Sequence, residues 1–250
     1  MTARHLFTAL VLAMAALLPA QAQDRSKPTL PQPGQIVLIP YLPEHYPAQA
    51  ATLLGNKLRQ MATENGLAGA GFDDRFIITT HIDALDKETT ATVPQKTVVR
   101  LSVTLYIGDG IDGTLFAQHE TEVRDIGSNE SQAWQAALRR LQPRDADTQA
   151  FIEQGRSRIV DYYNRVGSTI ITKAKTQAKS TQYDKAIATL LTIPSASKWY
   201  AEAQQLIAQY GQPAIENSNR ELLAKARAAW SARPNEEGAA EARMYLSRID

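Results

Sequence analysis

A regularly alternating stretch, 98–107, constrains the fold of this chain more than any other segment. Because successive side chains of a β-strand point to opposite faces, apolar residues at every second position predict a strand with one buried face. The segment 108–113 is rich in glycine and aspartate, which suit tight turns, and 114–124 can return as a second strand. The sequence therefore predicts an antiparallel hairpin, whose buried face carries Val99, Leu101, Val103, Leu105 and Ile107.

Four shorter patterns precede this hairpin. The continuous apolar run 36–42, bounded by a glycine and a proline, predicts a strand that is covered on both faces. Apolar residues at helical spacing predict an amphipathic helix over 47–65, and the β-branched segment 75–82 predicts another strand. The threonine-rich segment 87–94 is expected to be a polar connection.

A helix is expected directly after the hairpin. Ser128 and Asn129 can cap its first turn, and Gln132 lies in capping-box position. The expected order of elements is therefore strand, helix, strand, two hairpin strands and helix. After Pro143 only helical patterns remain, and glycines and prolines divide them into six expected helices. These lie at about 147–167, 170–178, 183–193, 199–210, 214–232 and 236–249.

Together these patterns predict an α+β protein. Its N-terminal α/β sandwich-like domain, 36–145, has a mixed or antiparallel sheet in the order β-α-β-β-β-α. An all-α domain of stacked helical hairpins follows over 146–250. A proline-rich linker, 23–35, precedes the first domain and is itself preceded by a signal peptide, 1–22.

The signal peptide has a short basic start, the apolar run 6–18, and small residues that suit cleavage after Ala22. The run is shorter than the roughly 20 residues of a membrane-spanning helix. The whole chain lacks cysteine, which excludes disulfides and thiolate metal sites. Since a bacterial lipoprotein carries its lipid on a cysteine, we expect a periplasmic or secreted protein that is not a lipoprotein.

Charge and hydropathy limit the expected partners. The sequence has 27 lysine and arginine residues against 26 aspartate and glutamate residues, and loss of Arg4 with the signal leaves 26 of each. Nucleic-acid binding generally needs a basic excess, so we expect no nucleic-acid partner. No apolar run after the signal approaches spanning length, so we expect no integral membrane segment after cleavage.

Two glycine-rich loops suggest ligand sites, but each fits a turn better. The segment 66–71 follows a predicted helix, whereas a dinucleotide loop follows a strand. Asp109 and Asp112 lack the further oxygen donors and the closing glutamate of a calcium loop. We therefore predict no cofactor at either loop.

The histidines and serines show no catalytic or metal-binding signature. His81 with Asp83, and His119 with Glu120 and Glu122, offer donor atoms, but adjacent strand residues point to opposite faces. We expect His119 to be partly buried on the apolar face of its strand. The chain also lacks the G-x-S-x-G and H-E-x-x-H arrangements of known hydrolases, and no S-x-x-K in it is followed by the usual partner motifs. We therefore predict no catalytic residue, no metal site and no enzyme, although scattered residues can also assemble a site.

Two segments resemble known families. The segment 182–187, of sequence QYDKAI, resembles the start of the second helix of a tetratricopeptide repeat, in which a small alanine lets two helices approach closely. This resemblance covers 168–194 and implies helical hairpins that can bind a peptide or a partner helix. Because Ala242, Leu246 and Ile249 repeat the spacing of an earlier helix, we expect an apolar face without a stacked neighbour near the C-terminus.

The element order over 36–141 resembles that of exported α/β domains. Examples are those of the curli-secretion lipoprotein, the flagellar-assembly protein T and the N-terminal domain of the Tol-system translocation protein. The resemblance is topological and implies a role in docking or assembly at the cell envelope.

Six residues are candidates for partner binding. They lie at the end of the first strand or in the helical half, where aromatic side chains line either a core or a binding groove. They are Tyr41, His45, Tyr46, Trp199, Tyr200 and Trp230.

The sequence is compatible with two classes of function. The first is an exported, non-catalytic scaffold or adaptor that binds other envelope proteins. The second is a periplasmic hydrolase or small-ligand-binding protein whose site at the strand ends has no linear motif. A deep pocket with convergent ionisable side chains favours the second, and an apolar groove or sheet edge favours the first. The sequence leaves the oligomeric state open.

Overall fold

The computed structural model describes residues 34–43, 46, 48–69 and 75–249. Within them the chain forms a four-stranded sheet and six helices, in the order β1, α1, β2, β3, β4, α2 and then α3 to α6. The predicted α+β class, with an all-helical C-terminal part, is confirmed. The predicted signal peptide and most of the predicted linker lie outside the described residues.

The sheet is mixed, and its strands lie side by side in chain order. The short β1 (Ile39–Pro40) runs parallel to β2 (Phe76–Thr89), which is antiparallel to β3 (Thr97–Asp109). The hairpin predicted from the alternating stretch is β3 with β4 (Leu115–Gly127). Val99, Leu101, Val103, Leu105 and Ile107 are all buried to 1% exposure or less, as the alternation predicts.

The second strand is longer than predicted. It continues to Thr89, whereas the sequence pattern ends the strand near Ile82 and predicts a polar connection over 87–94. The reason is pairing, because β3 holds β2 in register from Asp109 opposite Phe76 to Thr97 opposite Thr89. A neighbouring strand can therefore impose extended structure on polar residues that have little tendency to form it alone. In contrast, the first strand is shorter than the apolar run that predicts it.

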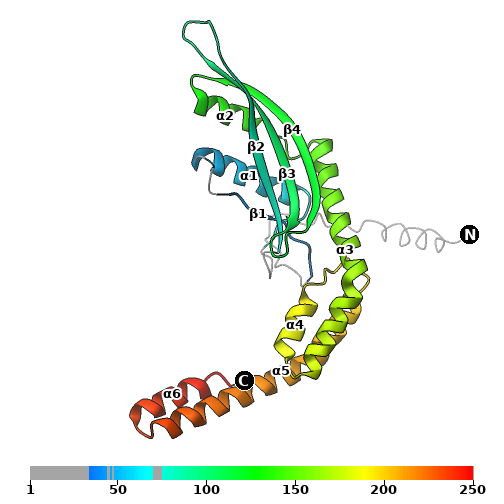
Figure 1. Cartoon of the computed structure of the whole chain (residues 1–250), viewed down its shortest axis with the longest axis vertical. Coiled ribbons are helices and arrows are strands. Elements are labelled where there is room, and N and C mark those ends of the chain that lie inside the picture. Colours follow the sequence, from blue (N-terminus) through cyan, green and yellow to red (C-terminus); the bar gives the residue numbers. More distant parts are fainter. Residues whose placement is uncertain (1–33, 44–45, 47, 70–74, 250) are drawn as a thin grey trace, which may run out of the picture. The chain divides into compact units, whose positions relative to one another are not determined.

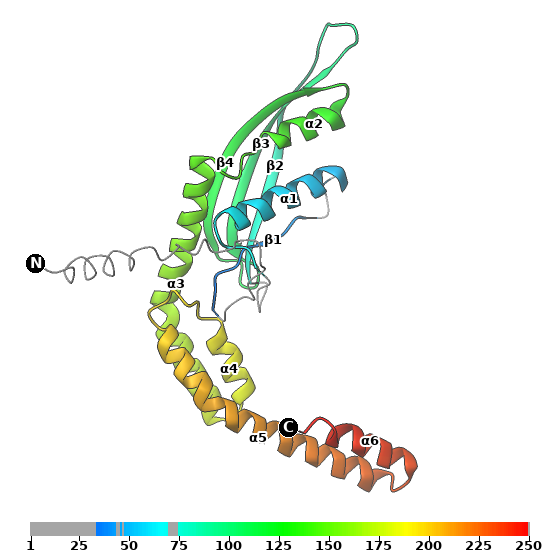
Figure 2. The ribbon, with the colours of Figure 1, turned by 180° about the vertical axis from the view of Figure 1, so that it is seen from behind.

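Two helices cover one face of the sheet, α1 (Ala48–Glu64) and α2 (Glu130–Arg139), as Figure 1 and Figure 2 show from opposite sides. The N-cap of α2 is as predicted, because the Asn129 side chain accepts a hydrogen bond of 3.0 Å from the Gln132 backbone N–H. The opposite face of β3 and β4 carries polar side chains such as Arg100 and Glu122, both exposed.

One long helix, α3 (Ala146–Lys179), replaces the two helices predicted to meet at Gly167. A continuous buried stripe, with a buried residue every three or four positions, runs along its whole length. Gly167 does not end the helix. Instead, its missing side chain makes room for the indole ring of Trp199, which a Cβ at this position would overlap. The glycine therefore serves close packing, and the prediction of a break here was wrong.

The remaining helices are α4 (Tyr183–Leu191), α5 (Tyr200–Ala232) and α6 (Glu236–Leu246). The helix α5 continues through Gly211 and Pro213, where the sequence predicts an end. A proline inside a helix costs about 3 kcal/mol. Burial of Tyr210 and Ala214 on either side keeps the same stripe of α5 packed across the proline and opposes that cost. The C-terminal part therefore has four helices instead of six.

The two predicted domains share one core. Buried residues form a continuous cluster from the sheet through α3 and α4 to Tyr210 in α5. The first half of α3 packs against β4, and its second half packs against α4. A hydrogen bond of 2.6 Å from the Ser195 N–H to the Gly34 carbonyl also joins the segment before β1 to the α4–α5 connection. The division at 145/146 stays a prediction.

Candidate interaction surfaces

The C-terminal hairpin, defined here as 211–249, is the most thinly packed of the helical segments that the structure describes. It consists of the second half of α5 and of α6, which begins with an N-cap at Asn235. Few of its residues are buried, and none of these belongs to the main core cluster. They are Ala214, Leu222, Ala226 and Gly238. Two helices alone cannot bury both of their sides.

Five large apolar side chains of this hairpin are exposed, and we call the two that share one face of α5, Leu223 and Trp230, the hairpin surface. Trp230 is 50% exposed and Met244 is 51% exposed. Leu223 and Trp230 lie seven positions apart on α5, so they share one face of that helix. Apolar side chains gathered on a surface often mark a site of protein interaction. The other exposed apolar side chains of the hairpin are Ile215, Met244 and Leu246.

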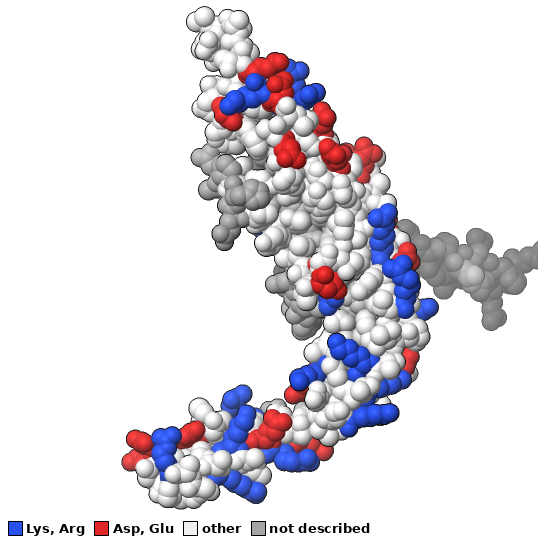
Figure 3. Space-filling model, viewed as in Figure 1, with Lys and Arg blue, Asp and Glu red and all other residues white. Residues whose placement is uncertain are grey.

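Charged side chains of both signs lie over α5 and α6, as Figure 3 shows. Arg233 pairs with Glu237 at 3.6 Å and with Glu241 at 3.8 Å, which ties the end of α5 to α6. Arg227 is exposed beside the Leu223–Trp230 face. An apolar centre with a charged rim is the usual composition of a protein–protein interface.

The six predicted binding residues differ in how exposed they are. Tyr46 is buried, and its hydroxyl donates a hydrogen bond of 3.1 Å to the Thr80 carbonyl at the edge of β2. Tyr200 is partly buried beside Gly34. Tyr41 is 55% exposed, and its backbone N–H donates to Ile78. His45 lies outside the described residues.

The two tryptophans among these six differ sharply. The Trp199 ring packs on Gly167, and its indole N–H donates a hydrogen bond of 3.0 Å to the Asn164 carbonyl. The Asn164 side chain also accepts from the Lys198 backbone N–H at 2.9 Å. Trp230 is instead half exposed on the hairpin surface. Their roles in binding stay predictions, but only Trp230 has free surface to offer.

One buried ionic cluster fixes the turn between β3 and β4. Arg75 Nε lies 2.5 Å from Asp109 Oδ2, and the other carboxylate oxygen of Asp109 accepts backbone hydrogen bonds from Ile111 and Asp112. These contacts give Asp109 the turn-forming role that the sequence predicts. Nearby in α3, Tyr163 is buried, and burial raises the pKa of its hydroxyl above the ordinary value. The cluster therefore holds the turn to the start of β2.

The predicted histidine positions match the structure where it describes them. His119 is partly buried, with its ring 5.9 Å from that of Phe151 in α3. His81 Nε2 lies 3.2 Å from Asp83 Oδ1, and both side chains are more than half exposed. No group of three or more acidic or histidine side chains among residues 34–43, 46, 48–69 and 75–249 is placed to hold a metal ion. Within the same residues, no helix is long and apolar enough to cross a membrane.

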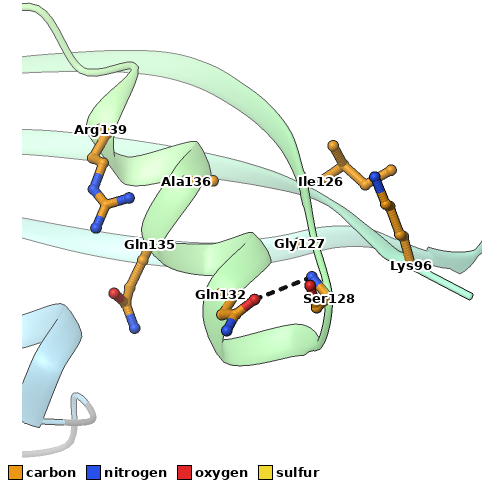
Figure 4. Close-up of a pocket in the computed structure, with 8 residues that line it drawn as sticks. All are labelled: Lys96, Ile126, Gly127, Ser128, Gln132, Gln135, Ala136 and Arg139. Atoms are coloured by element: carbon orange, nitrogen blue, oxygen red, sulfur yellow. Dashed lines mark hydrogen bonds between the residues drawn. The ribbon is translucent and has the colours of Figure 1, made fainter. Parts of the chain in front are cut away.

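A shallow groove of about 470 Å³ lies between α2 and the end of β4, as Figure 4 shows. One side of α2 contributes Gln132, Gln135 and Arg139. The other side comes from Ser128, Ile126 and Lys96, which lie at the paired ends of β3 and β4. The sequence gives no signal for this groove, because its two cations come from separate segments that only the fold brings together.

Comparison with known proteins gives weak structural similarity. No protein-family profile and no curated protein matches the sequence. A minor lipoprotein of Acinetobacter baumannii is similar over 50% of this chain and 95% of its own, at 14% identity and a TM-score of 0.33. A proposed lipoprotein of Caulobacter crescentus is similar over 54% of this chain and 94% of its own, at 16% identity and a TM-score of 0.28. Similarity this weak supports no functional assignment.

These two structures leave two predictions as they were. Neither is described as a curli-secretion, flagellar-assembly or Tol protein, so those resemblances stay predictions. Both are described as lipoproteins, so they lend no support to the prediction that this cysteine-free chain is not one.

Proposed function

We propose that this chain is an exported, non-catalytic envelope protein that binds another protein through the hairpin surface. The observation that carries the proposal is the half-exposed Trp230 on the same helix face as Leu223. Tryptophan is the side chain most often responsible for binding energy at protein interfaces. Here it stands on a helical pair that buries few of its own side chains.

The packing of the rest of the chain supports this choice of surface. Leu190 and Ile193, in and after α4, are buried to 1% exposure or less, whereas Leu246 at the equivalent spacing in α6 is 45% exposed. The first helical pair is therefore covered by a neighbour, whereas the second has none among the residues that the structure describes. A partner helix placed on this face would bury Leu223 and Trp230 together.

Capture from the native host tests the proposal. A tagged wild-type chain is compared with the double variant Leu223→Ser, Trp230→Ser and with a matched control, Val93→Ser. Val93 is 99% exposed in the β2–β3 connection, so its substitution changes one apolar side chain far from the hairpin. We expect one protein to copurify with the wild type and the control in constant proportion, and to be lost from the double variant.

Circular dichroism must show that all three proteins are folded. A set of copurifying proteins that is the same for the wild type and the double variant would contradict the proposed surface. The chain recovered reproducibly alone in all three forms would contradict the binding function itself.

The intact mass of the protein from its host tests export separately. Cleavage after Ala22 predicts a mature chain that begins at Gln23 and carries no added lipid. A mass that includes residues 1–22, or the mass of an acyl group, would contradict this part of the proposal.

A further inference from the structure

The groove beside α2 carries positive charge that no carboxylate of the described residues compensates. Its lining contains Lys96 and Arg139 and no acidic residue. Neither cation makes a side-chain ion pair or hydrogen bond with another described residue. By contrast, the charges next to the groove are paired, since Lys87 lies 3.0 Å from Glu130 and Arg140 lies 2.8 Å from Asp125.

The groove is elongated, and its two cations lie at opposite ends of the lining in Figure 4. Gln132 and Arg139 are seven positions apart on α2, which is about 10 Å along a helix axis. Lys96 lies beyond the Gln132 end, next to the Thr97–Gly127 pair that closes the β3–β4 ladder. An extended peptide rises about 3.3 Å per residue, so three or four residues cover the part of the groove along α2, and more are needed to reach Lys96 as well.

The groups between the two cations suit a peptide. The Ser128 backbone N–H donates to Gln132 Oε1 at 3.3 Å, which orients the Gln132 amide beside the groove. Ile126 is 42% exposed and offers an apolar contact. Small-molecule pockets are mostly apolar and enclosed, whereas this groove is polar and open.

We propose that the groove binds an extended acidic segment of a partner protein, with carboxylates at the Lys96 end and at the Arg139 end. This site is distinct from the hairpin surface, because it lies on the α2 side of the sheet and uses charge instead of apolar contact. The proposal therefore goes beyond the proposed function and does not depend on it.

Binding of a labelled peptide, followed by fluorescence anisotropy, tests the proposal on the full mature chain. The probe is Gly-Asp-Asp-Leu-Asp-Asp-Gly, and the reference is the same peptide with asparagine in place of aspartate. We expect saturable binding of the acidic peptide alone, weakening as salt is raised above about 0.1 M because the groove is open to solvent.

Charge-removing variants locate the site. Exposed ion pairs contribute about 0.2–1 kcal/mol each, so Lys96→Gln and Arg139→Gln should each weaken binding by about 1.4- to fivefold. The double variant should weaken it by about tenfold if the two contacts are independent. Lys173→Gln is the matched control, because Lys173 is an exposed cation on α3 outside the groove, and it should bind as the wild type does.

Three results would overturn the proposal. The first is equal binding of the acidic and asparagine peptides, or binding of neither. The second is wild-type affinity of the Lys96 and Arg139 variants, or an equal loss in Lys173→Gln. The third is binding of inorganic phosphate or of vesicles of anionic lipid that depends on Lys96 and Arg139, while the acidic peptide does not bind.

Discussion

The joint around Trp199 and the C-terminal hairpin around Trp230 use the same kind of side chain in opposite ways. At the joint, the partly buried indole of Trp199 packs on Gly167 of α3 and donates a hydrogen bond to the Asn164 carbonyl. On the hairpin, an indole of equal size is half exposed, and only two helices lie beside it. The number of elements that pack around a tryptophan therefore decides whether its side chain stabilises the fold or is exposed for binding.

This difference explains why the hairpin is the region best suited to binding. The sheet, α3 and α4 already bury their apolar faces in one continuous cluster that ends at Tyr210. A partner that docks there would have to displace existing contacts. On the hairpin, a partner would add burial at little cost to contacts within the chain.

The largest expected effect separates the two tryptophans by stability. Trp199→Ala should lower the free energy of unfolding by about 3 kcal/mol, because it leaves a cavity against Gly167 and breaks the bond to Asn164. Trp230→Ala should lower it by only about 1 kcal/mol, since half of the residue's surface is already in water. Urea unfolding measures both, and equal losses would remove the distinction.

Gly167→Ala should destabilise the joint by about 1–3 kcal/mol, because the added methyl group overlaps the Trp199 ring. Without that contact the same substitution would stabilise the helix by about 1 kcal/mol, so the sign of the change is diagnostic. In the background of Trp199→Ala, the penalty should disappear. A stabilised single variant would show that the ring does not pack on Gly167.

Hydrogen exchange compares the stability of the C-terminal hairpin with that of α3 without any substitution. Amides of α6 should exchange at least about tenfold faster than those in the first half of α3, because the hairpin buries few side chains and can open by itself. Mass spectrometry of peptides from both helices measures the difference. Equal protection would mean that the hairpin unfolds only with the whole protein.

The smallest expected effect concerns Tyr163 in the packed region. Its hydroxyl is buried without a hydrogen-bond partner among the described residues, so Tyr163→Phe should stabilise the protein by about 1 kcal/mol at neutral pH. Because burial raises the pKa of this hydroxyl, the wild type should lose stability as the pH rises above about 10, where the unfolded tyrosine ionises. The phenylalanine variant should lose less.

Unfolding followed across the alkaline range at several pH values tests this prediction. The difference between the two proteins isolates Tyr163 from the other groups that titrate there. A parallel loss of stability in both would show that the Tyr163 hydroxyl is not held neutral in the folded state.

Local patterns predicted the elements that depend on local contacts. The β3–β4 hairpin and the Asn129 cap of α2 follow from alternation and from capping chemistry within a few residues. Local patterns did not predict the polar end of β2 or the continuity of α3 and α5. There, pairing with β3 and burial along one stripe outweighed the local tendencies of polar residues, Gly167 and Pro213.

The candidate surfaces were less predictable than the elements that carry them. Trp230 was a candidate from its residue type, but Leu223 and Leu246 fit the apolar stripes of packed helices equally well. Only the absence of a third helix beside them, within the described residues, makes them surface. Lys96 and Arg139 show no shared pattern in the sequence, because the fold of β3, β4 and α2 brings them to one groove.

Site-specific photocrosslinking in living cells is the most direct test of whether the hairpin surface binds a partner protein. A photoreactive amino acid is placed at 230 on the hairpin surface and, in a separate strain, at 93 as the exposed control. If the partner binds at the hairpin surface, we expect one distinct adduct to another protein from position 230 and none from position 93. Adducts from both positions alike, or from neither, would contradict the claim that the hairpin surface is where this protein binds its partner.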